Sequence, residues 1–348
     1  RACRLLAELP DEEIAGDFAL DAFQGGAGTS TNMAANEWIA RRAESLSPGI
    51  AVDPHGDVNL HQSTNDVMPT ALRLLMHDHL LVLEERCETL QAVLQEGEER
   101  YDLLLKSGRT QLRDAVVTSL GREYGTWAHA LSRDRWRCFK ARERIREVNL
   151  GGTAVGTGAG APRRYVLGVI RYLQEEVAHP LSRAEHLVEA TSNYDQVVEA
   201  MEAPRALAVN LRRLASDIRL LSSGPGAGFG ELELPRLVPG SSIMAGKVNP
   251  VIPEAVIQAA ERILANDALI SRLASMSELE LNAFFPALAH TIRESLLLAR
   301  GAVESLTEYL PRLEPRREAI AAALEQNFAA GVALLPLARY EESDLLSG

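Results

Sequence analysis

The sequence predicts a mainly α-helical protein, built as a bundle of long helices with small mixed portions at its two ends. Leu, Ala, Glu and Arg dominate the 348 residues and aromatic residues make up only 5%, a composition that favours helices over sheets. Long stretches carry apolar residues at steps of three and four. Glycine-rich loops separate these stretches, which favours a bundle over an isolated coiled coil.

The first 62 residues alternate loops with one helix. Glycines predict a loop at 24–29, and a helix follows with Asn36 and Glu37 early in it. Residues 46–62 are rich in Ser, Pro, Asp and Gly and predict a second loop. This part is therefore expected to lie outside the helical bundle.

The first long helix is predicted where no Gly or Pro interrupts residues 71–95. One continuous apolar stripe runs along it, formed by Leu80, Leu83, Cys87, Leu90 and Leu94. Near its start, apolar residues go almost all the way round the helix: Leu72, Leu74, Leu75 and Met76. Because a single stripe suffices for packing within one chain, we expect the excess apolar surface to be buried between subunits.

Three more long helices follow. The second is predicted over about 114–146. The third carries its own apolar stripe, formed by Leu207, Leu211, Leu214, Ile218 and Leu221. The fourth begins near Pro253 and continues through Ile263 and Ile270. Together these helices predict a central bundle domain over residues 63–312.

Bulk properties exclude several classes of function. The formal net charge of −12 argues against nucleic-acid binding, for which a basic face is expected. Cys3, Cys87 and Cys138 are widely spaced and predict neither a disulfide framework nor a metal site, which favours a reducing cytoplasm. No apolar run reaches membrane-spanning length, and we expect no secretory signal.

The loop at residues 240–250 is the most informative stretch. Ser241 and Ser242 follow a glycine directly, and Lys247 and Asn249 precede a proline. In an extended loop, Lys247 and Asn249 would point to the same side. A mobile loop that carries a hydroxyl, a cation and an amide suits a small dianionic substrate.

Two further polar segments precede predicted helices. A glycine-rich segment places Thr29 beside backbone amides that can approach an anion closely. Ser63, Thr64 and Asn65 come just before the first long helix, whose free amides and partial positive charge suit a carboxylate. Each segment alone is also consistent with an ordinary helix cap, and for the glycine-rich segment taken by itself that interpretation is favoured.

A third polar segment occupies residues 108–115 and is predicted to precede the second long helix. Thr110 and Gln111 could bind a carboxylate there, and glutamine can both donate and accept a hydrogen bond. Arg109 is more often a surface ion pair than a substrate ligand. Taken together, the segments predict several anion-binding helix starts and one mobile serine loop.

The loop at 240–250 also fits the pattern Gly-Ser-Ser-x-Met-x-x-Lys-x-Asn-Pro at every fixed position. On this pattern the chain resembles the fumarase/aspartase superfamily. The other polar segments, with the glycine-rich residues 151–158, match further blocks of the superfamily in the same order. The resemblance implies a long-helix bundle of the fumarase/aspartase type. It also implies a homotetramer in which each active site is built from segments of three subunits.

Within the superfamily, the chain is most similar to aspartate ammonia-lyases, with class II fumarases next. Residues 220–225, 179–181 and 186–191 look like those of aspartate ammonia-lyases, and Gln111 stands where fumarases carry histidine. A glutamine cannot take a proton, so a water-activating role at that position is lost. The alternatives are a fumarase, a lyase for another substituted succinate, and a scaffold kept for a non-enzymatic role.

The resemblance implies that L-aspartate loses ammonia after a proton leaves the carbon next to its β-carboxylate. The charge flows into that carboxylate and gives an aci-carboxylate intermediate, which yields fumarate. Ser241 is implied as the base. Donors to the charged carboxylate are implied to be Thr29, Ser63 and Thr64, with help from Ser242.

The remaining site residues are also implied by the resemblance. Lys247 and Asn249 would hold the α-carboxylate with the help of Thr110 and Gln111, and Asn65 would contact the amino group. The reaction needs neither redox nor group-transfer chemistry. We therefore expect no organic cofactor, and the sequence shows no assembled metal site.

Several positions depart from the superfamily's pattern. The segment Asp53–Gly56 replaces the usual His-Pro-Asn-Asp, so a secondary anion site is not expected there. Ala245 replaces a proline, which should make the serine loop more flexible, and Gly226 replaces an arginine. Both ends look shorter than usual. We therefore expect 1–62 to be a remnant of an N-terminal domain and 313–348 a truncated C-terminal domain.

Overall fold

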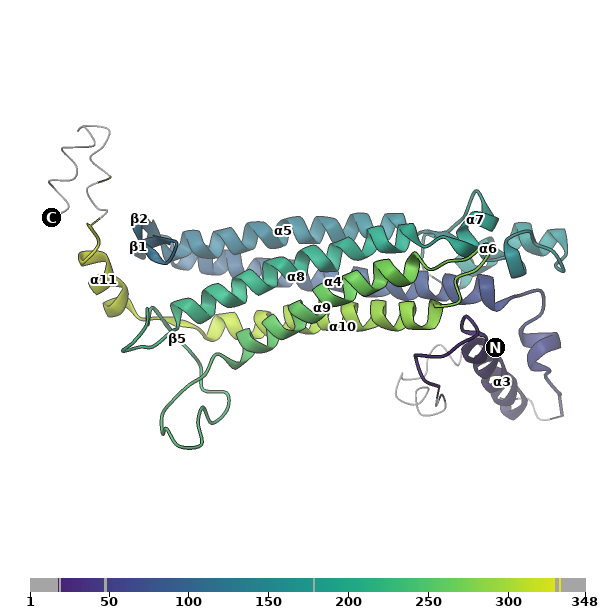
Figure 1. The fold of residues 1–348 in the computed structure, drawn as a ribbon, viewed down its shortest axis with the longest axis horizontal. Helices are drawn as coiled ribbons and strands as arrows, with labels where there is room; N and C mark the ends of the chain where they lie inside the picture. The colour runs from purple at the N-terminus through teal and green to yellow at the C-terminus, as the bar shows by residue number, and fades with distance from the viewer. Residues whose placement is uncertain (1–17, 19, 47–48, 178, 329–331, 333–348) are drawn as a thin grey trace. The chain divides into compact units, whose positions relative to one another are not determined.

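The computed structural model describes residues 18, 20–46, 49–177, 179–328 and 332, and its elements are mainly α-helical, as the sequence predicts (Figure 1). The α-helices are α3 (Thr29–Leu46), α4 (Thr64–Arg100), α5 (Leu120–Arg144), α6 (Arg163–Glu176), α7 (Leu187–Ser192), α8 (Asp195–Leu221), α9 (Val251–Ala274), α10 (Phe285–Tyr309) and α11 (Arg317–Glu325). Short π or 3-10 turns lie at Pro54–Val58, Thr153–Val155 and Leu310–Arg312. Within the described part of the chain, no helix combines the length and apolarity that crossing a membrane requires.

Strands are short and occur in pairs. The pairs are β1 (Leu105–Thr110) with β2 (Arg113–Ser119), β3 (Glu147–Val148) with β4 (Ser182–Arg183), and β5 (Leu232–Glu233) with β6 (Glu314–Pro315). The β3–β4 pair is parallel and the other two are antiparallel. Most backbone hydrogen bonds are therefore satisfied within helices.

The chain divides into two compact units, each of which takes one end of α4, α5, α8, α9 and α10. Unit 1 takes the described residues within 1–81, 138–203 and 264–297. Unit 2 takes those within 82–137, 204–263 and 298–348.

Polar contacts and an apolar cluster join the elements of unit 1. Arg73 Nη1 on α4 donates to Gln196 Oε1 on α8 at 2.8 Å. Asn266 Nδ2 on α9 donates to Ser295 Oγ on α10 at 3.1 Å. An apolar cluster packs α6 against the β3–β4 pair, and its buried members are Val148, Leu150, Ile170 and Leu181. These contacts hold the elements that surround the start of α4.

Unit 2 is held together in the same way. Trp127 Nε1 on α5 donates to Asp217 Oδ2 on α8 at 3.1 Å. Arg86 on α4 pairs with Glu304 on α10, with 3.0 Å between Nε and Oε1. The apolar stripes predicted for α4 and α8 are buried in this unit, which confirms both predictions. No residue of either stripe here is more than 7% exposed: Leu83, Cys87, Leu90, Leu94, Leu207, Leu211, Leu214, Ile218 and Leu221.

The prediction for the second long helix is wrong at its start. Residues 105–119 form a hairpin of β1 and β2, and α5 begins only at Leu120. Gln111 and Leu112 make its two-residue turn with φ of 53° and 60°, the left-handed values of a type I′ turn. Such turns favour Asn-Gly, so Gln-Leu gives no turn signal in the sequence. Gly108 also fits only as glycine, because a Cβ there would meet Val116 O at 2.6 Å.

Two smaller expectations also need correction. α3 begins at Thr29, so Asn36 and Glu37 lie beyond its first turn rather than early in the helix. Leu72 and Met76 are buried within this chain, and Leu74 packs against the apolar cluster of unit 1. These residues therefore do not by themselves require a partner subunit.

Candidate active site

The start of α4 is closed by a reciprocal pair of side-chain caps. Ser63 Oγ accepts a hydrogen bond from Asn65 N at 3.2 Å, and Asp66 Oδ1 accepts one from Ser63 N at 3.0 Å. This is the geometry of a capping box, in which a first-turn carboxylate reaches back to the residue that precedes the helix. Ser63, Thr64 and Asn65 are thereby held in fixed positions and are only partly buried.

Asp66 joins this helix start to the glycine-rich loop at 151–158. Its side chain is fully buried, and Oδ2 accepts hydrogen bonds from Gly151 N at 3.0 Å and Thr153 N at 2.9 Å. Burial raises the pKa of Asp66, and the three backbone amides partly offset that effect because they stabilise the carboxylate. One carboxylate thus fixes two of the polar segments against each other.

Asn65 strengthens the same junction. Its Nδ2 donates to Ala154 O at 2.7 Å, and Asn149 Nδ2 donates to Asn65 O at 2.9 Å. The side chain proposed to meet the substrate's amino group is therefore held by the glycine-rich loop.

Thr29 is the first residue of α3 and is exposed. One turn further on, Asn32 Nδ2 donates to Thr64 Oγ1 at 3.2 Å and to Asn59 Oδ1 at 3.2 Å. The structure therefore places the N-terminus of α3 beside the start of α4. Of the sequence-predicted residues, it brings Thr29, Ser63, Thr64 and Asn65 to one region of unit 1.

Replacing Asp66 with asparagine should lower the free energy of unfolding by about 2 kcal/mol. Asparagine keeps the size of the side chain, but its amide nitrogen would face backbone donors in place of an acceptor. Urea denaturation of both proteins measures the difference. Asp195→Asn is the matched control, because Asp195 is also in the first turn of a long helix but is exposed. Equal losses in the two variants would contradict the role given to Asp66.

Thr110 and Gln111 lie at the exposed tip of the β1–β2 hairpin in unit 2. This corrects the prediction that they stand at the start of a helix. A left-handed backbone at a residue other than glycine costs of order 1–3 kcal/mol and persists only where the surroundings impose it. The residues around the hairpin should therefore include a firm anchor.

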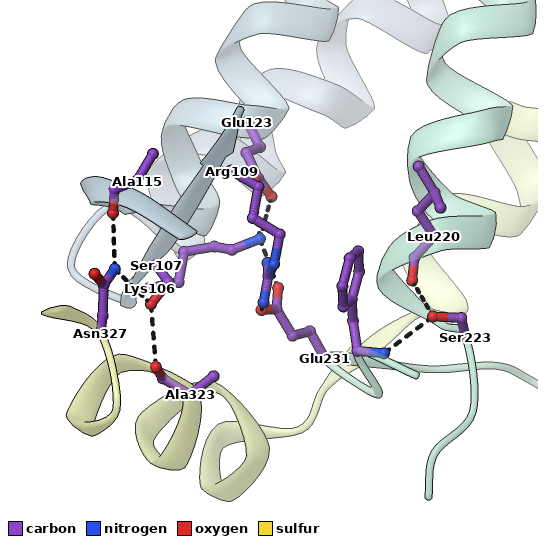
Figure 2. Close-up of polar contacts among 11 residues, drawn as sticks. Lys106, Ser107, Arg109, Ala115, Glu123, Leu220, Ser223, Glu231, Ala323 and Asn327 are labelled. Carbon is purple, nitrogen blue, oxygen red and sulfur yellow. Dashed lines mark hydrogen bonds and ion pairs between the residues drawn. The ribbon is translucent and has the colours of Figure 1, made fainter. Parts of the chain in front are cut away.

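A buried ion network supplies that anchor (Figure 2). Lys106 and Glu231 are both fully buried, with 2.6 Å between Nζ and Oε2. Lys106 Nζ also lies 2.8 Å from both carboxylate oxygens of Glu123 on α5, and Arg109 Nη2 lies 2.6 Å from Glu231 Oε1. The Arg109 guanidinium also covers the ring of Phe229, 4.2 Å from its centroid.

α11 holds the other side of the hairpin. Asn327, just after the helix, donates through Nδ2 to Ser107 Oγ at 2.9 Å and to Ala115 O at 2.7 Å (Figure 2). Ser107 Oγ in turn donates to Ala323 O at 3.2 Å. Thr110 and Gln111 are thus carried on a hairpin whose base is fixed on both sides.

The loop between β5 and α9 carries the other candidate residues and extends away from the helices (Figure 1). Ser241 Oγ accepts hydrogen bonds from Ile243 N at 3.2 Å and Met244 N at 2.9 Å. Asn249 Nδ2 donates to Gly240 O at 2.5 Å and closes the loop on itself. Gly240 must be glycine, because a Cβ there would collide with the carbonyl oxygen of Lys247.

Ser242 and Lys247 are exposed, and Lys247 makes no side-chain ion pair with any described residue. The loop surrounds a hollow of about 440 Å³ that Ser241 and Lys247 help to line. A hydroxyl and an unpaired ammonium thus border one space, where a small anion could be held.

The candidate residues therefore form three groups. Thr29 and the Ser63–Asn65 segment belong to unit 1. The hairpin tip and the serine loop both belong to unit 2, and no hydrogen bond or ion pair joins these two within the described residues. The union of all three groups in one pocket stays a prediction.

Sequence reasoning missed the residues that hold these groups in place. Asp66 follows Ser63 by three residues, the spacing of a capping box, and that spacing was the signal available in the sequence. Lys106 and Glu231 gave no signal, because their partners are distant in sequence. Glu231 follows a glycine in a loop, and this pattern alone does not predict a buried ion pair.

The chain is similar to known lyases in both sequence and structure. The sequence profile of a family described as "Lyase" matches residues 4–265. The aspartate ammonia-lyase of Bacillus subtilis (strain 168) is 36% identical over 346 residues, which cover 97% of this chain and 73% of that protein. That of Pseudomonas canavaninivorans is 45% identical over 300 residues, which cover 84% of this chain and 63% of that protein.

A solved structure agrees with these sequence relatives. The fumarate lyase/delta crystallin of Brucella melitensis bound to cobalt has a TM-score of 0.89 and is 37% identical. The alignment covers 99% of this chain and 80% of that protein. The similarity thus extends along nearly all of this chain, while the chain spans 63–80% of these three proteins.

Proposed function

We propose that this chain, which belongs to the lyase family within the fumarase/aspartase superfamily, deaminates L-aspartate reversibly to fumarate and ammonia. Aspartate ammonia-lyases are similar to it over almost its whole length. The reaction is a carbon–nitrogen cleavage. It removes one proton from C3 and the amino group from C2, and a C2–C3 double bond remains.

The observation that carries the chemical proposal is the geometry of Ser241. A serine hydroxyl is a poor base unless its oxygen bears a stabilised negative charge. The amides of Ile243 and Met244 both donate to Ser241 Oγ, and two such donors stabilise an alkoxide. The nearby Lys247 ammonium adds a positive charge to the same loop. Ser241 is therefore suited to take the C3 proton.

Deprotonation at C3 places a second negative charge on the β-carboxylate, so catalysis depends on donors aimed at that group. Thr29, Ser63 and Thr64 provide hydroxyls at two helix N-termini, and Ser242 adds one from the loop. Free amides and the helix dipoles at these N-termini favour the same charge. The aci-carboxylate then expels the amino group, and the C2–N electron pair leaves with the ammonia.

The α-carboxylate and the amino group of the substrate must also be bound while the proton is removed. Lys247 and Asn249 bind the α-carboxylate, with Thr110 and Gln111 from the hairpin, and Asn65 contacts the amino group. Gln111 supplies no proton-accepting group, which favours ammonia loss over water addition.

We further infer a homotetramer in which segments of three subunits complete each site. The support is apolar surface on long helices: Trp136, Val209 and Leu269 are 62%, 53% and 38% exposed. Large contiguous patches of such side chains are typical of subunit interfaces, so we propose that these residues contribute to one. Cys138 is buried and forms no disulfide with another described residue, which fits a reducing cytoplasm.

Fumarate formation tests the proposed function directly. The purified chain is incubated separately with L-aspartate, L-malate and argininosuccinate, and fumarate is followed by its ultraviolet absorbance. We expect fumarate from L-aspartate and little from the other two. Release from malate alone would identify a fumarase, and release from argininosuccinate alone would identify another lyase of the superfamily; either result overturns the proposal.

A further inference from the structure

Three metal-ligating side chains meet in unit 1, away from the segments proposed for catalysis. His77 and Asp78 lie on α4, and His179 lies between α6 and β4. One ligand atom from each of the three lies within 4.8 Å of the others. His179 Nε2 is 3.0 Å from Asp78 Oδ1, and the rings of His77 and His179 meet edge to face with centroids 4.6 Å apart.

The two histidines have ring nitrogens with unused bonding capacity. His77 is only 5% exposed, and its buried Nδ1 has no hydrogen-bond partner within the described part of the chain. The same holds for the buried Nδ1 of His179. Buried polar atoms normally find a partner, so these two unpartnered nitrogens on neighbouring rings require an explanation.

Charged side chains of both signs lie around His77. Burial lowers the pKa of His77, and His179 and Arg142 lower it further, while Asp78 and Glu143 act in the opposite direction. The positive charge of Arg142 opposes a bound cation, but the carboxylates of Asp78 and Glu143 compensate for it.

We propose that His77, Asp78 and His179 form a binding site for one divalent transition-metal ion of the zinc type. Two imidazoles and one carboxylate are an established ligand set for zinc, with a fourth position left for water. Ligands that share a zinc ion at about 2.0–2.1 Å lie roughly 3–4 Å apart, so the three side chains need to close by only about 1 Å. The Asp78 side chain is 59% exposed, which gives the ion a path from solvent.

The site is distinct from the candidate active site. His77 lies thirteen residues beyond Thr64 on α4, which is about 20 Å at the rise of an α-helix. A bound ion would connect α4 to the segment that leads into β4, where β3 and β4 pair over only two residues each. Its role is therefore to brace the fold of unit 1 and not to touch the substrate.

Zinc binding to the whole chain provides the test. The protein is stripped with a chelator, dialysed, and titrated with zinc chloride at neutral pH by calorimetry. We expect one ion per chain with a dissociation constant of roughly micromolar or tighter. Cobalt(II) in place of zinc should give the visible absorption of a four-coordinate ion.

Variants distinguish coordination from general attraction of cations. Asp78→Asn and His179→Ala should each weaken zinc binding by at least about a hundredfold, since even loss of an outer-shell partner costs about 10–100-fold. His129→Ala removes an exposed histidine away from the site and should bind zinc within a few-fold of the parent. Circular dichroism without metal checks that each variant is folded. Absence of saturable binding in the parent, or parent-like binding by folded Asp78→Asn and His179→Ala proteins, overturns the proposal.

Discussion

Replacing Ser241 with alanine should lower kcat for L-aspartate by at least about a hundredfold, the usual minimum contribution of a positioned base. The hydroxyl is the group proposed to take the C3 proton, and alanine offers no substitute. KM should change only a few-fold, because the carboxylate-binding residues remain. Steady-state fumarate release with parent and variant measures both quantities.

The matched control is Ser275→Ala, which removes an exposed hydroxyl near the end of α9. It should retain parental activity. Thermal unfolding should be alike for both variants, since Ser241 lies in a loop whose side-chain contacts are local. A loss of less than tenfold in kcat for Ser241→Ala would remove Ser241 as the base and leave it as a substrate ligand.

Replacing Glu231 with glutamine should lower the free energy of unfolding by about 3–5 kcal/mol, the range found when one partner of a buried ion pair is removed. Glu231 is fully buried between Lys106 and Arg109, so the change leaves two cations without their shared carboxylate. Glu123 still neutralises Lys106 from the other side, which should allow the protein to fold. Chemical denaturation followed by circular dichroism measures the loss.

Glu233→Gln is the appropriate comparison, because Glu233 is only two residues further along the chain, in β5, and is exposed. Its effect should stay below about 0.5 kcal/mol, as for most surface substitutions. Glu231→Gln should also raise KM for aspartate, since the network fixes the hairpin that carries Thr110 and Gln111. Equal stability of the two variants would show that the network contributes nothing to the fold.

The long helices could be predicted because their signal is local. The stripe from Leu80 to Leu94 repeats every three or four residues, and such a repeat reports burial wherever a helix packs. Ser63, Thr64 and Asn65 were also placed correctly at a helix start, because the sequence signal for a helix cap is local too. A cap acts within one turn and needs no distant partner.

The hairpin and the ion network could not be predicted because their causes lie elsewhere in the chain. Gln111 and Leu112 adopt a backbone that their own chemistry disfavours, and distant contacts at the base of the hairpin impose it. Lys106 has its partners on α5 and next to β5, and no sequence spacing indicates such a meeting. The catalytic roles came from a resemblance, and the structure places their residues in three groups without testing the chemistry.

The bond between Asp66 and the glycine-rich loop has a consequence for biosynthesis. Its partners Gly151 and Thr153 lie 85 and 87 residues further along the chain. On the ribosome, α4 is therefore made long before its first turn can be completed, and the carboxylate must stay hydrated until that loop emerges. Native contacts this far apart in sequence slow folding. The helix start that carries Ser63 and Thr64 should thus mature late, after much of the nascent polypeptide has left the exit tunnel.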